Sequence, residues 1–315
     1  MPRIVFISGY TLMQKILYTV KHVTGLTFLA LYTSLGKNMT IEKTAKDLHL
    51  AVKDINILKT PSGIEQLRDL KPDWIFNVNS MVIFTKDILA IPRLGCLNLH
   101  MGKLPEYAGL HVHQWAIRND ERIFASTVHW MEEKIDTGPI AYVQEFPVTS
   151  QDTGLSLFMK CKSAGEQIVL RALNDIASGK FPPKIAQDLS KRTLYTNKDA
   201  ENGRICWKWS SRQIYNFVRA ADYHPLHSPT YTPACTLSDG RTIHILKAKQ
   251  SSLSSRQPGE VIAVEKEGII VGTQDKLSIC ITKIKDDQNM VVEGETIAKV
   301  LGCSAGDVLV DVGDL

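Results

Sequence analysis

The chain has 315 residues, of which 44% are hydrophobic and 22% are charged, and this composition excludes a disordered or fibrous protein and allows two domains. Its net charge of +4 is too small for this length to indicate nucleic acid or an anionic membrane as a partner. Six cysteines lie singly without a C-x-x-C pair, so no disulfide framework or metal site is expected. The N-terminus lacks a signal-peptide pattern and no stretch reaches about 18 uninterrupted apolar residues. We therefore expect a cytoplasmic protein.

Short apolar runs alternate with polar segments of helical period from residue 3 to about residue 100. The runs are IVFIS, LTFLALY, WIFNV and LGCLNL, and the helical segments are 11–22, 39–49, 63–70 and 84–90. Two more strand-like runs follow at 124–131 and 138–148, and then an amphipathic segment from about 153 to 178. This rhythm is typical of crossover helices on a parallel sheet. It predicts an α/β domain with a Rossmann-like, doubly wound, mostly parallel sheet over residues 1–180.

The second half of the chain has a different pattern. Residues 179–203 are rich in Pro, Lys, Asp and Asn, which is typical of a surface linker. One helical segment at about 211–221 precedes several short β-rich runs separated by SDG, QPG and KEG. Evenly spaced short strands with glycine turns indicate a small barrel or sandwich. We expect a linker over 181–203 and a smaller, β-rich, barrel-like (OB-like) domain over 204–315.

The stretch NLHMGKLPEYAG places an amide and an imidazole at the end of a predicted buried strand. Asn98 and His100 are two positions apart, so they lie on one face of the strand. Ligands bind beyond the carboxyl ends of the strands of open parallel sheets. Asp136 follows in a turn before a glycine. These residues therefore form a candidate site at the strand ends.

An amide donor, an imidazole and a carboxylate are suited to acyl transfer. The amide stabilises an oxyanion, the imidazole moves a proton and the carboxylate orients the imidazole. No Ser or Cys nucleophile adjoins them in the sequence, which favours direct attack by the acceptor. The spacing alone also allows a simpler interpretation, in which Asn98 and His100 only form a turn and satisfy the core.

The sequence resembles the formyltetrahydrofolate-dependent formyltransferases, whose motif has the form N-x-H-x-S-L-L-P-x-Y-x-G, followed by D-x-G. The matching residues are Asn98, His100, Leu104, Pro105, Tyr107, Gly109, Asp136 and Gly138. Residues 71–100 also follow the family pattern that leads to the catalytic strand. Residues 203–220 and 238–248 resemble the entry to the C-terminal barrel domain. The resemblance covers most of the chain.

The resemblance implies that N10-formyltetrahydrofolate is the co-substrate, that no metal is needed, and that the first domain is catalytic. It makes Asn98, His100 and Asp136 the catalytic residues. It places the folate against Asn79, Ser80, Met81, Val82, Ile83 and Gly138. We expect acceptor contacts from Tyr10, Lys103, Tyr107, His111 and Trp115, although a packing role is open for Tyr10, Tyr107, His111 and Trp115. We expect His129 to be a packed strand residue rather than a catalyst.

Departures from the family pattern concern the acceptor. Gly102 and Lys103 stand where Ser-Leu is usual, and Ala108 replaces a basic residue. The basic insertion of methionyl-tRNA formyltransferases is missing, and residues 204–315 hold 13 Lys/Arg and 13 Asp/Glu. A domain with balanced charge attracts phosphates weakly. We therefore expect a small amine rather than nucleic acid as the acceptor.

A nucleotide-linked amino sugar is the acceptor that we favour, because this chain extends beyond the length of glycinamide ribonucleotide formyltransferases. The alternatives are an amino-acid or carrier-bound amine of secondary metabolism, and then methionyl-tRNA. A folate-binding sensor without turnover is the non-enzymatic alternative, and the intact Asn98, His100 and Asp136 disfavour it. No membrane partner is expected, and a homodimer is considered for the assembly.

Overall fold

The computed structural model describes residues 1–9, 12–36, 39–197, 203–237 and 239–311. They form two compact units, each assembled from segments that are distant in the sequence. The first unit comprises Met1–Val112, Ile123–Pro147 and Phe158–Leu194, and the second comprises His113–Arg122, Val148–Leu157 and Tyr195–Leu315. Residues 181–194, which the sequence suggests as part of a linker, therefore pack with the first unit.

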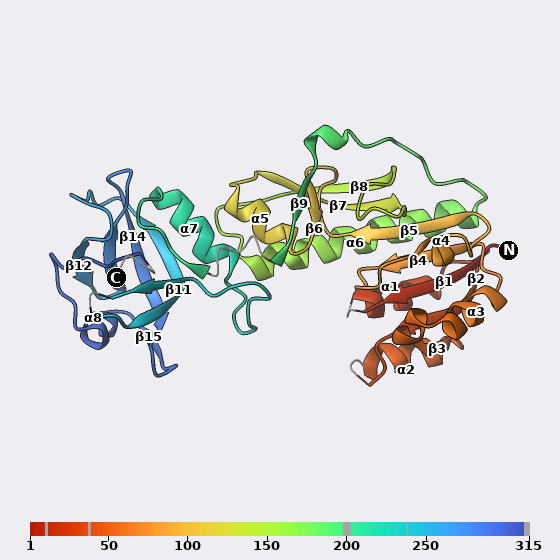
Figure 1. The fold of residues 1–315 in the computed structure, drawn as a ribbon, viewed down its shortest axis with the longest axis horizontal. Coiled ribbons are helices and arrows are strands. Elements are labelled where there is room, and N and C mark those ends of the chain that lie inside the picture. The colour runs from red at the N-terminus through yellow and green to blue at the C-terminus, as the bar shows by residue number, and fades with distance from the viewer. Residues whose placement is uncertain (10–11, 37–38, 198–202, 238, 312–315) are drawn as a thin grey trace. The chain divides into compact units, whose positions relative to one another are not determined.

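The first unit is built on a sheet that has seven strands among the described residues (Figure 1). Neighbouring strands run in the order β3-β2-β1-β4-β5-β7-β8. Pairs from β3 to β5 are parallel, whereas the β5–β7 and β7–β8 pairs are antiparallel. The strands are β1 (Arg3–Ser8), β2 (Thr27–Thr33), β3 (Ala51–Asp54), β4 (Trp74–Val78), β5 (Gly95–His100), β7 (Ile123–Trp130) and β8 (Ile140–Pro147). The expected α/β fold with a mostly parallel sheet is confirmed.

Helices connect the parallel strands, and their apolar residues face the core. The helices of this unit are α1 (Leu12–Val20), α2 (Met39–Asp47), the 3₁₀ helix η1 (Ile55–Lys59), α3 (Pro61–Asp69), α4 (Lys86–Leu89), α6 (Gly154–Ala177), whose first turn belongs to the second unit, and the 3₁₀ helix η2 (Leu189–Lys191). Helix α3 begins earlier than expected because the Thr60 side chain accepts the Gly63 N–H at 3.2 Å and caps it. The helix expected at 84–90 is a single turn. Within the described ranges, no helix combines the length and apolar content needed to cross a bilayer.

The strands of the first sheet differ in how deeply they are buried. Strands β1 and β4 are almost fully buried, which explains their uninterrupted apolar runs. The edge strand β3 is four residues long and partly exposed, so its sequence carries no clear strand signal.

A separate two-stranded sheet pairs β6 (Tyr107–Gly109) with β9 (Thr193–Tyr195). Strand β9 thus brings the segment after α6 back beside the loop that follows β5 (Figure 1).

The second unit has an antiparallel sheet in the order β10-β11-β14-β13-β12, with β15 paired to β14. Its strands are β10 (Ala234–Thr236), β11 (Thr242–Ser251), β12 (Val261–Glu265), β13 (Gly268–Gly272), β14 (Ser278–Lys285) and β15 (Val291–Glu293), and its helices are α5 (Val112–Arg118), α7 (Ser211–Ala220) and α8 (Thr296–Leu301). Val310 pairs with Thr236, and Val308 pairs with Glu260 next to β12. One C-terminal segment therefore joins both edge strands and closes the sheet, as the barrel-like prediction requires.

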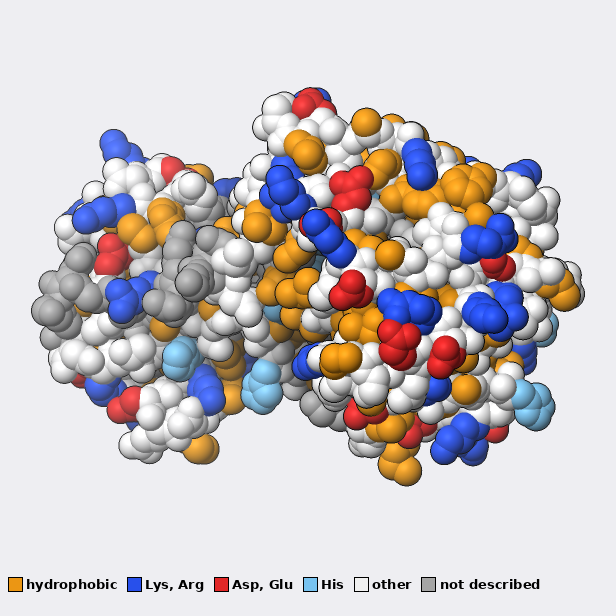
Figure 2. Space-filling model, turned by 45° about the vertical axis from the view of Figure 1, so that its right-hand side comes forward, with side chains coloured by type: hydrophobic (Ala, Val, Ile, Leu, Met, Phe, Trp, Pro, Cys, Tyr) orange, Lys and Arg blue, Asp and Glu red, His pale blue; other side chains and the backbone are white. Residues whose placement is uncertain are grey.

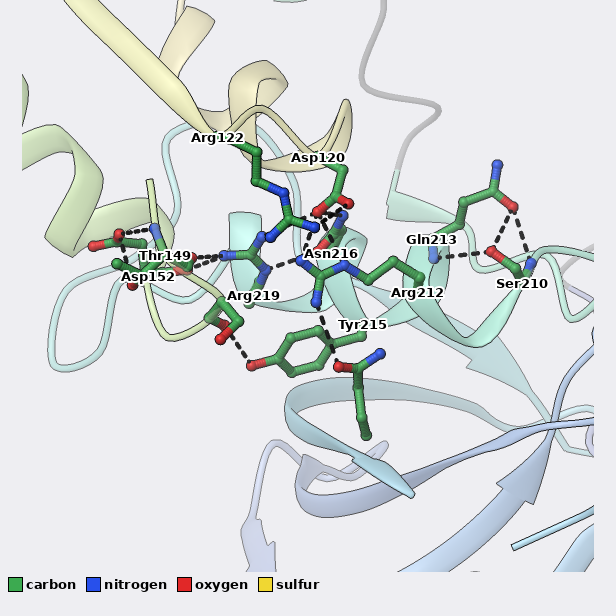
Figure 3. A network of polar contacts seen from close by, with 12 residues as sticks. Asp120, Arg122, Thr149, Asp152, Ser210, Arg212, Gln213, Tyr215, Asn216 and Arg219 are labelled. Atoms are coloured by element: carbon green, nitrogen blue, oxygen red, sulfur yellow. Dashed lines mark hydrogen bonds and ion pairs between the residues drawn. The ribbon is translucent and has the colours of Figure 1, made fainter. Parts of the chain in front are cut away.

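Helix α7 is stabilised by polar side chains at its start and along one face (Figure 3). Ser210 and Gln213 form a reciprocal capping box at its first turn. Further along, Arg212 Nη2 donates to Asp120 Oδ1 at 2.6 Å, and Asn216 Nδ2 donates to the same oxygen at 3.1 Å. These contacts tie the segment 113–122 to α7 within the second unit.

Arg219 connects α7 to a second segment in the same network (Figure 3). Its side chain is 5% exposed. Its Nη1 donates to the carbonyl oxygens of Thr149 (3.1 Å) and Asp152 (2.6 Å), and its Nε donates to Asn216 Oδ1 at 2.8 Å. One buried guanidinium thus links α7 to two main-chain carbonyls of the segment 149–152.

Replacing Arg219 by Ala should destabilise the protein by about 2–5 kcal/mol, because the buried Asp152 carbonyl and the buried Asn216 amide lose their donor. Chemical denaturation monitored by tryptophan fluorescence measures this change. Arg256→Ala, at an exposed position, is the matched control and should change stability by less than about 0.5 kcal/mol. Equal stabilities of the two variants would show that the network does not hold α7.

Candidate active site

Three polar side chains lie side by side across the middle of the first sheet. Asn98 on β5 is in register with Asn77 on β4 and with His129 on β7. Asn77 Nδ2 donates to Asn98 Oδ1 at 2.9 Å, and Asn98 Nδ2 lies 3.0 Å from His129 Nε2. The Asn98 amide is therefore held from both sides, which fixes its orientation near the carboxyl end of β5.

His129 links this amide to a carboxylate. Its Nδ1 lies 2.7 Å from the Trp130 carbonyl, and a carbonyl only accepts, so Nδ1 carries a proton. In the neutral ring, Nε2 accepts from Asn98; in the protonated ring, Nε2 can donate to Asp136 Oδ1, 3.3 Å away. The sequence suggests a packed strand residue, and the ring is indeed buried, but its nitrogens also face two of the expected catalytic residues.

The side chains of His100 and Asp136 lie close together, next to the loop that follows β5. His100 Nδ1 is 3.6 Å from Asp136 Oδ2, and both side chains are 8% exposed. His100 Nε2 donates to the Tyr107 carbonyl at 2.6 Å, and the Gly109 N–H donates to Asp136 Oδ2 at 2.9 Å. The main chain of β6 thus contacts both members of the pair. The structure brings together Asn98, His100 and Asp136, as the sequence predicts.

The charge of Asp136 follows from these contacts. Burial by itself would raise the pKa of this carboxyl, but the opposing effects prevail. The charge of His100, the hydrogen bond and charge of His129 and the Gly109 N–H together hold the pKa of Asp136 well below its ordinary value of 3.8. Asp136 is therefore an ionised carboxylate at neutral pH, next to two imidazole rings.

Gly102, a departure from the family motif, has a structural reason in this chain. A Cβ atom at this position would lie 2.4 Å from His100 Nε2 and 2.8 Å from the Tyr107 carbonyl oxygen. The glycine therefore leaves room for the hydrogen bond between that ring and that carbonyl. Thr127 Oγ1 donates to the Gly102 carbonyl at 2.7 Å and fixes the loop in place.

The residues expected to contact folate lie in the loop after β4 and at Gly138. Asn79 has a φ of 53°, the Val82 N–H donates to Ser80 Oγ at 3.3 Å, and Met81 and Ile83 are 66% and 70% exposed. Gly138 has a packing role, because a Cβ atom there would lie 2.0 Å from the Trp130 carbonyl oxygen. Folate contact by these residues stays a prediction.

The residues expected to contact the acceptor lie in different surroundings. Tyr10 falls outside the described residues. Lys103 and His111 are half-buried, and burial lowers the pKa of His111. The Tyr107 ring is buried edge-on against Phe124, with ring centroids 5.2 Å apart, so its carbonyl is the part that faces His100. Trp115 belongs to the second unit and stacks on Tyr195 at 4.8 Å. Acceptor contact by this group stays a prediction.

Sequence reasoning missed Asn77 and the site contacts of His129. A polar Asn inside the apolar run WIFNV is the signal that could have identified Asn77, and its role depends on the register of β4 and β5. His129 offers a weaker signal, since buried strand histidines are common in cores. Among the described residues, no group of three or more His, Cys, Asp or Glu could hold a metal ion.

An amide, an imidazole and a carboxylate in one cluster on an α/β fold are suited to acyl transfer. The sequence matches the family model described as Formyl transferase over residues 45–173 and the one described as Formyl transferase, C-terminal domain, over residues 198–302. It is 30% identical over 245 residues to the methionyl-tRNA formyltransferase of Thermodesulfovibrio yellowstonii, an overlap of 77% of this chain and 76% of that protein. The chain belongs to the formyltransferase family.

Solved structures with low sequence identity share the fold. One is the N-formyltransferase from Helicobacter canadensis in complex with folinic acid and dTDP-3-aminofucose, with a TM-score of 0.68, 18% identity and coverage of 89% of this chain and 99% of that chain. Another is WlaRD, a sugar 3N-formyltransferase in the presence of dTDP and 5-N-formyl-THF, with a TM-score of 0.65, 19% identity and coverage of 89% and 97%. Both extend over the two units described here.

The lowered pKa of Asp136 predicts how its contribution to stability varies with pH. The ionised carboxylate stabilises the folded state at pH values above the ordinary 3.8, and this contribution is lost as the pH falls toward the lowered folded value. The difference in urea midpoint between the wild type and Asp136→Asn should therefore be larger at about pH 6 than at about pH 3. Asp47→Asn, at an exposed position on α2, is the control. A difference that stays constant with pH would contradict the proposed charge state.

Gly102→Ser should lower turnover by about 10- to 100-fold, because a Cβ atom 2.4 Å from His100 Nε2 must displace the His100 ring, and small misplacements of reacting groups are costly. Gly102→Ala should show a similar loss, since the Cβ atom alone makes the contact. Steady-state kinetics and melting temperatures of both variants measure the effect. Wild-type turnover in either variant would show that the close approach is not needed.

Proposed function

We propose that this protein transfers the formyl group of N10-formyltetrahydrofolate to the amine of a small molecule, with nucleotide-linked amino sugars as the acceptor class. One observation carries the proposal: the Asn98 amide, the His100 ring and the Asp136 carboxylate lie near the end of β5 in one cluster of hydrogen-bond and ion-pair contacts, joined through His129. The bound donor supplies an activated formyl group. The residues of this chain must then stabilise charge and move protons.

Asn98 provides the donor for the developing charge. An amide nitrogen carries two N–H bonds, and in the neutral state of His129 one of them is donated to His129 Nε2. The other is available for the formyl oxygen as negative charge develops on it. Because Asn77 and His129 hold the amide, little reorganisation is needed at the moment of reaction, which is the condition under which such a donor is most effective.

His100 and Asp136 handle the proton of the attacking amine. At rest His100 Nε2 carries a proton, which it donates to the Tyr107 carbonyl. The ring must leave this carbonyl and become the neutral tautomer that is protonated at Nδ1 before Nε2 can accept a proton from the amine. The ionised Asp136 then stabilises the imidazolium through Nδ1, 3.6 Å away. The same proton can return to the departing nitrogen of the donor, which completes the transfer.

The loop after β4 has properties that fit a pterin ring. Its side chains Met81 and Ile83 are large, apolar and more than half exposed, so they offer apolar surface against which a flat ring can pack. The loop follows β4, whose Asn77 holds the amide of Asn98. A flat aromatic ring bound by this loop would lie beyond the carboxyl ends of the parallel strands, near the cluster of Asn98, His100 and Asp136.

Charge and structural similarity favour a small acceptor. Residues 204–315 hold equal numbers of basic and acidic residues, and on the face drawn in Figure 2 the Lys and Arg side chains are intermixed with Asp and Glu. Recognition of tRNA depends strongly on basic surface. The solved structures with the same fold include enzymes named for sugar N-formylation.

Methionyl-tRNA is the second candidate acceptor. It is favoured by the sequence relatives, because the methionyl-tRNA formyltransferases of Thermodesulfovibrio yellowstonii and other bacteria are about 30% identical to this chain. The two candidates differ in one measurable property. Transfer to tRNA should fall steeply as salt is raised, whereas transfer to a small amine should respond only weakly.

We expect formyl transfer to one or more nucleotide-linked amino sugars and negligible formylation of charged methionyl-tRNA. A panel of amino sugars, amino acids and charged initiator tRNA is incubated with N10-formyltetrahydrofolate, and tetrahydrofolate release is followed together with product mass. His100→Ala is the inactive control. Efficient, salt-sensitive formylation of the tRNA would replace the sugar proposal by the second candidate.

A further inference from the structure

The segment 181–194 makes regular contacts within the first unit although its composition is typical of a linker. Ile185 and Ile140 exchange two main-chain hydrogen bonds of 2.8 and 2.9 Å. Trp130 Nε1 donates to the Pro183 carbonyl at 2.8 Å, and Lys184 Nζ lies 4.1 Å from the centre of the Trp130 ring. This strap, residues 181–194, is therefore anchored to β7 and β8, on either side of the turn that carries Asp136.

Side chains of the strap bind the main chain of that turn. Gln187 Nε2 donates to the carbonyl oxygens of Asp136 (3.1 Å) and Gly138 (2.6 Å), and Arg192 Nη2 donates to the Ile135 carbonyl at 2.9 Å. Gln187 Oε1 is buried without a hydrogen-bond partner among the described atoms. The hydrogen bonds that hold the Gln187 side chain are therefore those donated by Nε2, and both go to the turn that carries Asp136.

The turn needs such support. Asp136 has a φ of 56°, a backbone conformation that residues other than glycine adopt at a cost in free energy. Asn98 and His100 lie on a strand inside a sheet, whereas Asp136 lies on a turn between β7 and β8. Its carboxylate nevertheless meets two rings at 3.3 and 3.6 Å, distances that depend on how the turn is held.

The strap also contacts β6, the strand whose main chain binds His100 and Asp136. Its strand β9 pairs with β6, and the Thr193 N–H donates to the Glu106 carbonyl at 3.3 Å. Strand β6 supplies the Tyr107 carbonyl to His100 and the Gly109 N–H to Asp136. One continuous segment therefore fixes both backbone elements that contact the His100–Asp136 pair.

We propose that the strap sets the position of the Asp136 carboxylate and that Gln187 is its main positioning residue. The inference rests on the proposed catalytic function of Asp136. Gln187 reaches Asp136 through the carbonyl oxygens of the turn, so it acts through this residue. Its loss should therefore lower kcat and leave the KM for the formyl donor nearly unchanged.

The test compares substitutions that differ in their capacity to donate. Gln187→Ala and Gln187→Met remove the donor, and both should lower kcat by about tenfold, the scale of a small misplacement of a catalytic group. Gln187→Lys keeps a donor and should restore kcat to within about threefold of the wild type. Gln144→Ala, at a half-buried glutamine on β8 whose Nε2 donates to the Glu145 carbonyl, is the matched control and should behave as the wild type.

A second comparison separates positioning from general stability. In the Asp136→Asn background, Gln187→Ala should cause less than about a twofold further loss of kcat, because residues that act through one another are not additive. Unchanged kcat in both Gln187→Ala and Gln187→Met would overturn the proposal, and so would an equal loss in the two backgrounds.

Hydrogen exchange tests the positioning role of the strap independently of the proposed function. The Gly109 N–H, which donates to Asp136, should exchange at least about fivefold faster in Gln187→Ala than in Gln144→Ala, because a displaced carboxylate no longer protects it. This readout needs no activity. If the wild type transfers no formyl group, the proposed function fails, while faster exchange still supports the strap and unchanged exchange overturns it.

Discussion

The hydrogen bonds that hold the Asn98 amide between β4 and β7 are the constraint on which the site depends. They form only if β4, β5 and β7 keep a register that aligns Asn77, Asn98 and His129. That register is set by the apolar strands of the sheet, since a slip by one residue would turn every side chain to the other face. The core of the first unit therefore determines the direction of a single amide N–H.

The other groups of the site are arranged around this row. His129 connects the amide to Asp136, and Asp136 connects to His100 through a distance of 3.6 Å. His100 approaches the Tyr107 carbonyl because Gly102 leaves room for it. Rigid strands thus provide the amide and the imidazoles, and a turn provides the carboxylate, whose low pKa comes from the rings that it faces.

Much of this could be predicted from the sequence, because it depends on local pattern. The continuous apolar run WIFNV predicted the buried strand β4, and the two-residue spacing of Asn98 and His100 predicted a common face. The placement of Asp136 near them also followed from the family motif. Each of these inferences uses residues that are close in the sequence or a motif that is specific.

The remainder depends on contacts between distant segments, which periodicity does not reveal. Asn77 and His129 join the site through strand register, and Gln187 reaches the turn from about fifty residues away. Trp115 packs with Tyr195 in the second unit, so nearly all of helix α5 follows the motif in sequence but belongs to another unit. Polar composition indicated a linker over 181–203, because the stabilising contacts of residues 181–194 are mainly hydrogen bonds that involve main-chain atoms and leave no apolar pattern.

The central claim is that the held amide of Asn98 stabilises charge that develops during formyl transfer. Single-turnover transfer by Asn98→Ala tests it most directly, with binding of the formyl donor measured separately and Asn174→Ala, exposed on α6, as the control. The account predicts a rate about 10²–10³-fold below that of the wild type, the range for loss of one oxyanion donor, with nearly unchanged donor affinity. A rate close to that of the wild type would contradict it.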